Sequence, residues 1–223
     1  MAETFRLRVC FGKTGRLRHL SHLETMRASE RAARRAGLPY AVTQGFTPRM
    51  RISFGPALPV GTAGEHEYFD LLLTRYVPAD EARAMLAGAI ADELAPVACG
   101  YVDAREPSLA ASLTIAEYLV FIEGGIPPEE VEHSLERLHD AGTFAVEHKG
   151  KKKVFDLTEA LPKKPEVDVD RDGVSVRMTV RIGERGSLRP ELFVRAAACD
   201  ATRIVVTRTD LMCEDEGVWR RPL

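Results

Sequence analysis

The chain of 223 residues is long enough for one large or two small domains, and with 45% hydrophobic, 29% charged and 7% aromatic residues it is not a disordered, collagen-like or coiled-coil protein. Its net charge of −2 hides an uneven distribution, because residues 1–52 hold eleven Lys or Arg against three Asp or Glu. The first quarter is therefore basic, which is typical either of a surface for a polyanion or of a solvated Arg-rich face.

The sequence contains no membrane-spanning segment, export signal or metal-binding pattern. No apolar run reaches the roughly 18 residues that a transmembrane helix needs, and residues 1–9 lack the basic-then-apolar order of a secretory signal. The cysteines at positions 10, 99, 199 and 213 form no C-x-x-C pair and no zinc-ligand spacing. We therefore expect a cytoplasmic protein with no membrane partner, no metal and no cofactor.

The first half of the chain predicts alternating strands and helices. Apolar residues alternate at 5–11, which predicts a strand. Ser21 and Glu24 have the spacing of a capping box, so a helix is expected from about His22, and Gly37 is expected to end it. Further patterns predict strands at 49–54, 65–73 and 95–103 and a helix at 78–90.

The second half repeats this order of elements. It predicts a strand at 113–123, a helix at 127–141, a hairpin of 143–148 with 153–157, a strand at 174–182, a helix at 190–199 and a strand at 203–212, and the polar residues 162–173 are expected to be a linker. The β-α-β-β-α-β order is that of the ferredoxin-like sandwich. We therefore predict an α+β protein of two tandem ferredoxin-like halves, at 1–105 and 112–215, with antiparallel sheets and helices on one face.

The stretch Gly12-Lys13-Thr14-Gly15 lies between the first predicted strand and helix. It is not a P-loop, because that motif needs a glycine where Leu7 stands. It matches the G-x-x-G of KH domains, although plain turns have the same pattern. Backbone amides, a helix N-terminus and nearby cations together suit a phosphate. The predicted phosphate-binding residues here are Lys13, Arg16, Arg18 and His19.

Two histidines are the candidate catalytic residues, because histidine changes its charge near neutral pH. His19 or His22 could act as general base at a ribose 2′-OH while Lys13 binds the phosphate, as metal-independent RNA cleavage requires. A hydrogen-bonded core histidine is the better explanation of His22, and capping of the turn is the better explanation of His19. We therefore expect a binding protein rather than an enzyme.

The sheet face turned away from the helices is expected to be charged. Strand alternation assigns to it Arg6, Arg8, Arg49, Arg51, Tyr68 and Asp70. Such a face could bind a phosphate backbone or contact the other half of the chain, but it lacks the aromatic signature of RNA-recognition domains. Arg49 and Arg51 complete the predicted RNA-binding set.

Residues 13–61 form a long and specific motif. The matching positions are Lys13 to Gly15, Leu17, Arg18, Leu20 to Leu23, Arg34 to Pro39, Gly45, Phe46, Pro48 and Leu58 to Gly61. On these residues the chain resembles the radical-SAM-associated family of bacterial proteins, found alone or as an extension of cobalamin-binding radical SAM proteins. The chain departs from the family pattern at two places. Glu24 stands where Asp is usual, and Thr47 and Arg49 replace the Asn and His of the G-F-N-P-H pattern, which weakens a histidine-based site in this loop.

The resemblance implies an accessory role in RNA modification. The chain has no cysteine triplet at cluster spacing, so it is not expected to be the radical enzyme itself. Our first hypothesis is an RNA-binding protein that presents tRNA or rRNA to a separate radical SAM protein. The alternatives are a metal-independent endoribonuclease, which would be similar to CRISPR-repeat processing enzymes, and a protein adaptor that does not bind RNA.

Overall fold

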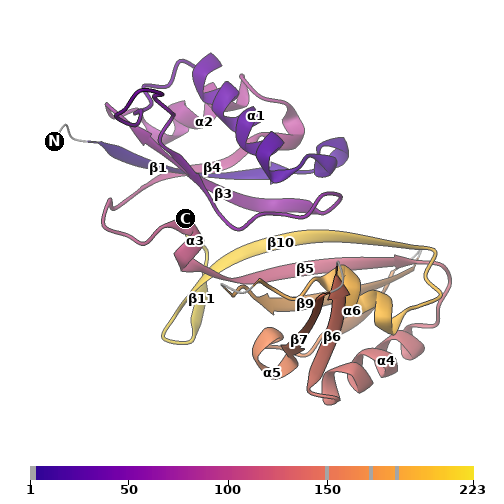
Figure 1. Cartoon of the computed structure of the whole chain (residues 1–223). Helices are drawn as coiled ribbons and strands as arrows, with labels where there is room; N and C mark the ends of the chain where they lie inside the picture. The colour runs from indigo at the N-terminus through magenta and orange to yellow at the C-terminus, as the bar shows by residue number, and fades with distance from the viewer. Residues whose placement is uncertain (1–3, 149–150, 171–172, 184–185) are drawn as a thin grey trace. The chain divides into compact units, whose positions relative to one another are not determined.

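The computed structural model describes residues 4–148, 151–170, 173–183 and 186–223. It divides into two compact units (Figure 1). Unit 1 consists of Met1–Leu113 together with Arg220–Leu223, and unit 2 of Thr114–Trp219. The division follows Leu113, next to the linker that the sequence predicts between residues 105 and 112, and the last four residues of the chain return to unit 1.

Unit 1 is a sheet covered on one face by helices. Its elements are β1 (Phe5–Lys13), η1 (Gly15–His19), α1 (His22–Arg35), β2 (Ile52–Phe54), β3 (Ala63–Leu73), α2 (Ala79–Ala87), η2 (Asp92–Leu94), β4 (Pro96–Val102) and α3 (Leu109–Ser112). The strand order is β4-β1-β3, with β2 on the other side of β3, and β1 pairs antiparallel with β3 and β4, as β2 does with β3. This is the strand order of a ferredoxin-like sheet, with α1 and α2 on the same face (Figure 1).

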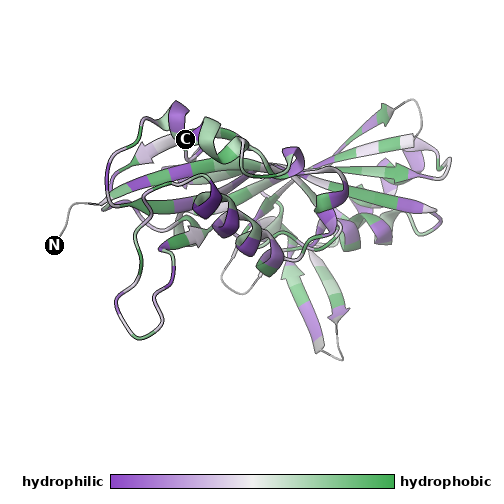
Figure 2. Ribbon diagram, turned by 90° about the horizontal axis from the view of Figure 1, so that it is seen from above, coloured by the Kyte–Doolittle hydropathy of each residue, from purple (hydrophilic) through white to green (hydrophobic). Residues whose placement is uncertain are grey.

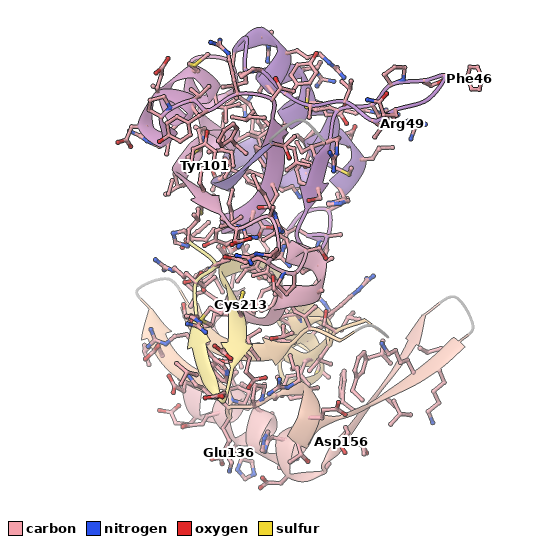
Figure 3. All side chains as sticks on the ribbon, turned by 90° about the vertical axis from the view of Figure 1, so that its left-hand side faces the viewer. Phe46, Arg49, Tyr101, Glu136, Asp156 and Cys213 are labelled. Atoms are coloured by element: carbon pink, nitrogen blue, oxygen red, sulfur yellow. The ribbon has the colours of Figure 1, made fainter. Side chains whose placement is uncertain are left out.

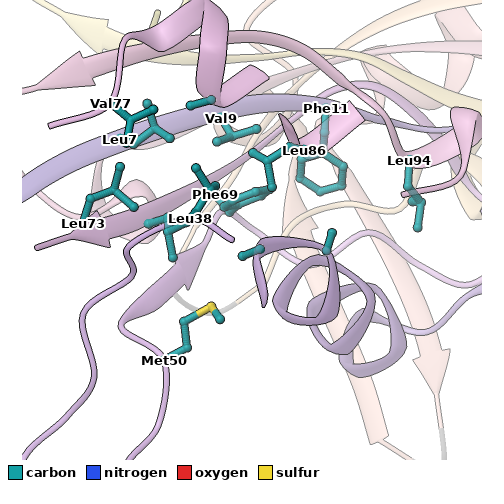
Figure 4. Close-up of a cluster of buried hydrophobic side chains, with 14 residues drawn as sticks. Leu7, Val9, Phe11, Leu38, Met50, Phe69, Leu73, Val77, Leu86 and Leu94 are labelled. Carbon is teal, nitrogen blue, oxygen red and sulfur yellow. The ribbon is translucent and has the colours of Figure 1, made fainter. Parts of the chain in front are cut away.

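The core of unit 1 lies between this sheet and its two helices. Alternation along β1 directs Leu7, Val9 and Phe11 to the helices, where they are buried against β3, α1 and α2 (Figure 4). The helix α1 contributes small side chains, Ala32 and Ala33, so its backbone can lie close to the sheet. The same alternation is visible along the strands as bands of hydrophobic and hydrophilic residues (Figure 2).

Both ends of α1 follow the sequence signals. The capping box is confirmed, since Ser21 Oγ accepts from Glu24 N and Glu24 Oε2 accepts from Ser21 N at 2.8 Å. At the other end Gly37 has a φ of 68°, and the amides of Gly37 and Leu38 donate to the carbonyls of Arg34 and Ala33. These two bonds form a Schellman motif, which ends the helix as predicted.

The strand expected at 49–54 is shorter than the sequence indicates. Only Ile52–Phe54 pairs with β3 as a strand. Arg51 is bonded through its backbone to Ala41 and Leu72, and Met50 forms an isolated bridge with Val42. The alternating residues before Ile52 therefore form one limb of a projecting loop.

Unit 2 has the same strand order with an inserted hairpin. Its elements are β5 (Leu113–Glu123), α4 (Pro128–Asp140), β6 (Thr143–His148), β7 (Lys151–Asp156), α5 (Leu157–Ala160), β8 (Glu166–Asp170), β9 (Gly173–Arg181), α6 (Pro190–Ala197), β10 (Arg203–Asp215) and β11 (Val218–Arg220). The order in its sheet is β10-β5-β9-β8, and β6 and β7 form a separate two-stranded sheet. The α+β class with antiparallel pairing is thus confirmed, whereas the tandem arrangement of the two halves stays a prediction.

The predicted linker at 162–173 is wrong, because it contains the edge strand β8. Glu166, Asp168 and Asp170 alternate with Val167 and Val169, and the strand pairs antiparallel with β9. Its acidic residues at an edge position disfavour pairing with another chain. The predicted hairpin forms, but outside the sheet, and its residues 149–150 lie outside the described part.

Candidate nucleic-acid interface

The six predicted RNA-binding residues occupy three places in unit 1. Lys13 lies at the end of β1 and lines a small cavity. Arg16, Arg18 and His19 belong to η1. Arg49 and Arg51 belong to the loop between α1 and β2. The structure therefore separates residues that the sequence placed in one phosphate site and on one sheet face.

Lys13 is buried, with 2% of its surface exposed. Lys13 is in phase with the inward-facing Phe11 along β1, and both residues line a cavity of about 20 Å³. Glu67, which is 6% exposed, and the half-buried His22 line the same cavity. A space of this size holds about one water molecule, so it does not admit a nucleotide.

Glu67 is a charged residue of this cavity that the sequence reasoning missed. It stands opposite Phe11 and in phase with the inward-facing Phe69, so alternation along β3 could have identified it. Gly64 makes room for it, because a Cβ on Gly64 would lie 2.5 Å from Glu67 Oε1. The cavity thus brings an ammonium, a carboxylate and an imidazole together inside unit 1.

On η1, Arg16 and His19 are exposed, whereas Arg18 has a structural contact. Arg18 Nε donates to the carbonyl of Gly61 at 2.9 Å, and Gly61 N donates back to the carbonyl of Arg18 at 3.0 Å. Arg18 therefore holds the turn that precedes β3. The N-terminus of α1 already has an anion beside it, because the Glu24 carboxylate accepts from Ser21, and these hydrogen bonds lower the pKa of Glu24.

The loop between Val42 and Met50, here called the Phe46 loop, projects from unit 1 (Figure 3). Its two limbs are joined by backbone bonds, including Thr43 N to the carbonyl of Arg49 at 2.8 Å. Phe46 lies at the outer end with a relative accessibility of 110%, and Arg49 follows on the returning limb (Figure 3). In the sequence Phe46 is one position of the motif at residues 13–61, and its neighbours Gly45 and Pro48 are the signal for an exposed turn.

A long stretch of unit 1 has cations and no carboxylate. Between Glu30 and Glu65 the sequence has no Asp or Glu. Five arginines with exposed side chains lie in that interval, at positions 31, 34, 35, 49 and 51. Within it, Arg34 reaches back to Glu30 at 3.5 Å. The end of α1, the Phe46 loop and its junction with β2 therefore present a net positive charge.

On β1 and β3 the predicted charged face is largely buried instead of open, with Arg8, Tyr68 and Asp70 all buried, whereas Arg49 and Arg51 do not lie on it but are exposed in the loop between α1 and β2. Arg8 donates from Nε and Nη2 to the Asp70 carboxylate, and Arg6 Nε donates to the same group at 2.8 Å. Arg6 also donates to the carbonyls of Glu106 and Pro107. The expectation that Arg6 and Arg8 could bind phosphate is wrong, because a carboxylate and carbonyls of unit 1 already accept their hydrogen bonds.

The described part of the chain has no group of three or more His, Cys, Asp or Glu side chains placed to hold a metal ion. Across residues 4–148, 151–170, 173–183 and 186–223, no helix is long and apolar enough to cross a bilayer.

Cys99 lies on β4, and burial raises the pKa of its thiol to about 12. This thiol is therefore protonated at neutral pH.

Comparison with known proteins identifies a family but no reaction. A family model described as "Uncharacterized protein conserved in bacteria (DUF2344)" matches residues 6–190. No curated protein matches the chain. Among solved structures, a chain of a Cbf5-Nop10-Gar1 complex aligns with a TM-score of 0.44 and 12% identity, covering 94% of this chain. This chain spans 50% of the length of that one.

Proposed function

We propose that this chain, which belongs to the bacterial DUF2344 family, is an accessory RNA-binding protein that presents a tRNA or rRNA to a separate radical SAM modification enzyme. The observation that supports RNA binding best is the carboxylate-free interval between Glu30 and Glu65 with its five exposed arginines. Exposed arginines bind phosphates by releasing counterions, which favours a nucleic acid as the partner.

The contacts are assigned to the exposed members of the predicted set. Arg16, His19, Arg49 and Arg51 are exposed and reach solvent. Arg18 is half-buried, and its hydrogen bond to the carbonyl of Gly61 fixes η1 against the turn that precedes β3. Lys13 is buried and lines the same cavity as Glu67, so it does not contact phosphate in this proposal. We assign it an indirect role, in which it supports the position of the adjacent η1.

The radical SAM partner is proposed from the sequence motif at residues 13–61. Four scattered cysteines cannot hold an iron–sulfur cluster in the way that a Cys triplet does, so the chemistry would belong to the partner. Crosslinking in the native cell, followed by identification of the attached RNA and protein, tests this part. Recovery of a radical SAM protein without RNA would favour the adaptor hypothesis instead.

RNA binding is tested by the salt dependence of affinity. The triple variant Arg16→Ser, Arg49→Ser, Arg51→Ser removes three exposed cations of unit 1. Each lost phosphate contact lowers the slope of log affinity against log salt by about 0.7 for a single strand, so the three together should lower it by about 2. Arg189→Ser, Arg195→Ser, Arg203→Ser is the matched control, because it removes three exposed cations of unit 2. Absence of binding by the parent chain at low salt would end the proposal.

An endoribonuclease is the second candidate, because Lys13, Glu67 and His22 line one cavity. A base, an acid and a cation at one place could transfer a proton. Metal-independent cleavage that disappears in His22→Ala or His19→Ala would support it. The room for only about one water argues for the binding protein, since a scissile phosphate must reach the base.

A further inference from the structure

Phe46 has an exposure that the fold of unit 1 does not explain. Its relative accessibility of 110% is the highest among the exposed large hydrophobic residues, the next being Val169 at 76%. Tyr76 is also exposed, but its ring packs against Tyr101 with centroids 5.0 Å apart. Among the described residues no aromatic ring contact includes Phe46. A large ring contributes to stability mainly by being buried, so Phe46 contributes little to folding.

The loop that presents Phe46 is tied to the sheet by its backbone. Ala41 N donates to the carbonyl of Leu72 at 2.7 Å, Leu72 N to that of Arg51 at 3.0 Å, and Arg51 N to that of Ala41 at 2.8 Å. Nearer the tip, Arg49 N donates to Thr43 Oγ1 at 3.0 Å. These bonds connect the limbs of the loop to β3, so the ring is presented by an ordered support and little ordering is needed on binding.

The charges around Phe46 select a polyanion. Arg49 and Arg51 are exposed on the limb that follows Phe46, and no carboxylate lies in the sequence between Glu30 and Glu65. Three residues of chain span at most about 11 Å, so the Arg49 backbone stays within that distance of Phe46. An exposed aromatic ring beside arginines is the combination with which proteins bind single-stranded nucleic acids, the ring stacking on a base and the cations contacting phosphates.

We infer that Phe46 is a stacking platform for one unpaired base of an RNA, with Arg49 and Arg51 on the adjoining phosphates. This rests on the proposed RNA-binding function and specifies its substrate as a single-stranded or locally opened segment. Bases inside an A-form duplex are stacked on each other and are not available to a ring from outside. The Phe46 loop therefore distinguishes an exposed loop or bulge from a continuous helix.

The test compares a single-stranded oligouridylate with a duplex of the same oligouridylate and oligoadenylate. Phe46→Leu keeps an apolar side chain without an aromatic face, and its affinity for the single strand should fall roughly 5- to 150-fold, the range of one lost stacked base. Phe46→Trp should retain the affinity of the parent chain. The new indole should be quenched on binding, above the background of Trp219, the single tryptophan of the chain. The affinity for the duplex should be the same in all three proteins.

Val169→Ala, which truncates the next most exposed apolar residue, is the control and should not change the affinity for the single strand. Equal affinity of Phe46→Leu and the parent for oligouridylate would overturn the stacking inference while the salt-dependent RNA binding stands. Loss of a co-purifying protein in Phe46→Leu, with RNA affinity unchanged, would also overturn it. If the parent binds neither the single strand nor the duplex, the proposed function itself fails.

Discussion

Arg8 and Asp70 stand directly opposite each other on β1 and β3 and form a bidentate ion pair, with Nε to Oδ1 at 2.8 Å and Nη2 to Oδ2 at 3.1 Å. Both residues are buried. Arg6 shares the same carboxylate, and Arg8 Nη1 donates to the carbonyl of Pro222 at 3.1 Å. One carboxylate thus connects two neighbouring arginines of β1 with β3, and Arg8 extends the network to the last residues of the chain.

Replacing Asp70 should destabilise the protein severely. Asp70→Asn removes the charge that faces both guanidinium groups, and loss of one partner of a buried ion pair costs about 3–5 kcal/mol. The free energy of unfolding from urea denaturation at neutral pH measures this. Asp103→Asn is the control, because that carboxylate pairs with Arg105 on the surface and should change stability little. Equal losses in the free energy of unfolding would show that the buried pair of Asp70 stabilises the protein no more than the surface pair of Asp103.

The capping box of α1 gives a second prediction. Ser21→Ala should lower the free energy of unfolding by about 1 kcal/mol, because the Glu24 amide loses its acceptor. Ser108→Ala provides a matched comparison, since Ser108 is an N-cap without a side-chain capping bond and its replacement should matter less. Thermal denaturation of the two variants separates these expectations, and a larger loss in Ser108→Ala would contradict them.

In unit 2 the pH dependence of stability should report on Glu214. Hydrogen bonds from Arg181 and from Trp219 Nε1 lower the pKa of Glu214 from 4.5 to about 2. A lowered pKa stabilises the folded state above about pH 4.5, and this contribution is lost as the pH falls toward 2. Glu214→Gln should therefore melt at a lower temperature than the parent chain at pH 7. This difference in melting temperature should decrease as the pH falls from about 4.5 toward 2.

Trp219 offers an independent readout of the same titration. It is the single tryptophan and donates to Glu214 Oε1 at 3.0 Å, so its emission should change with a midpoint near pH 2 while the chain stays folded. Glu136→Gln, an exposed position on α4 (Figure 3), should leave the transition in place. A transition near the ordinary carboxyl range would show that the Arg181 contact is absent in solution.

Thiol alkylation should distinguish two of the cysteines. Burial raises the pKa of Cys99 to about 12, so its reactive thiolate is scarce at pH 8 and below, and becomes abundant only as the pH approaches 12. Cys199 is exposed. Iodoacetamide at pH 8 should therefore modify Cys199 much faster than Cys99, as measured by peptide mass spectrometry. In denaturant the two rates should converge, whereas similar rates in the native protein would contradict the raised pKa of Cys99.

Local signals in the sequence predicted much of the fold. The alternation at 5–11 and the capping box of Ser21 and Glu24 involve only neighbouring residues, and the structure has both the strand and the cap where the sequence put them. The strand β8 was missed because its alternate positions are Glu166, Asp168 and Asp170, which read as a polar linker. An edge strand tolerates a row of acidic side chains, because only one of its two edges pairs with another strand and the charges disfavour further pairing.

The chemistry of the site depended on contacts that are distant in the sequence. The basic charge of residues 1–52 was evident, but the burial of Lys13 beside Glu67 and the pairing of Arg8 with Asp70 require β1 to lie next to β3. Strand alternation gives the face of a residue and not what covers that face. The exposure of Phe46 was not predicted either, because an aromatic residue in a motif is ordinarily expected in a core.

The contact between Arg8 and Pro222 also bears on the order in which the chain folds during synthesis. Domains generally form as they leave the ribosome, beginning at the N-terminus. Here unit 1 includes Arg220–Leu223, so the ribosome must translate all of unit 2 before the carbonyl of Pro222 can accept from Arg8. The nascent chain therefore holds an incomplete first unit throughout elongation of the second, and it completes that unit only when residue 222 emerges.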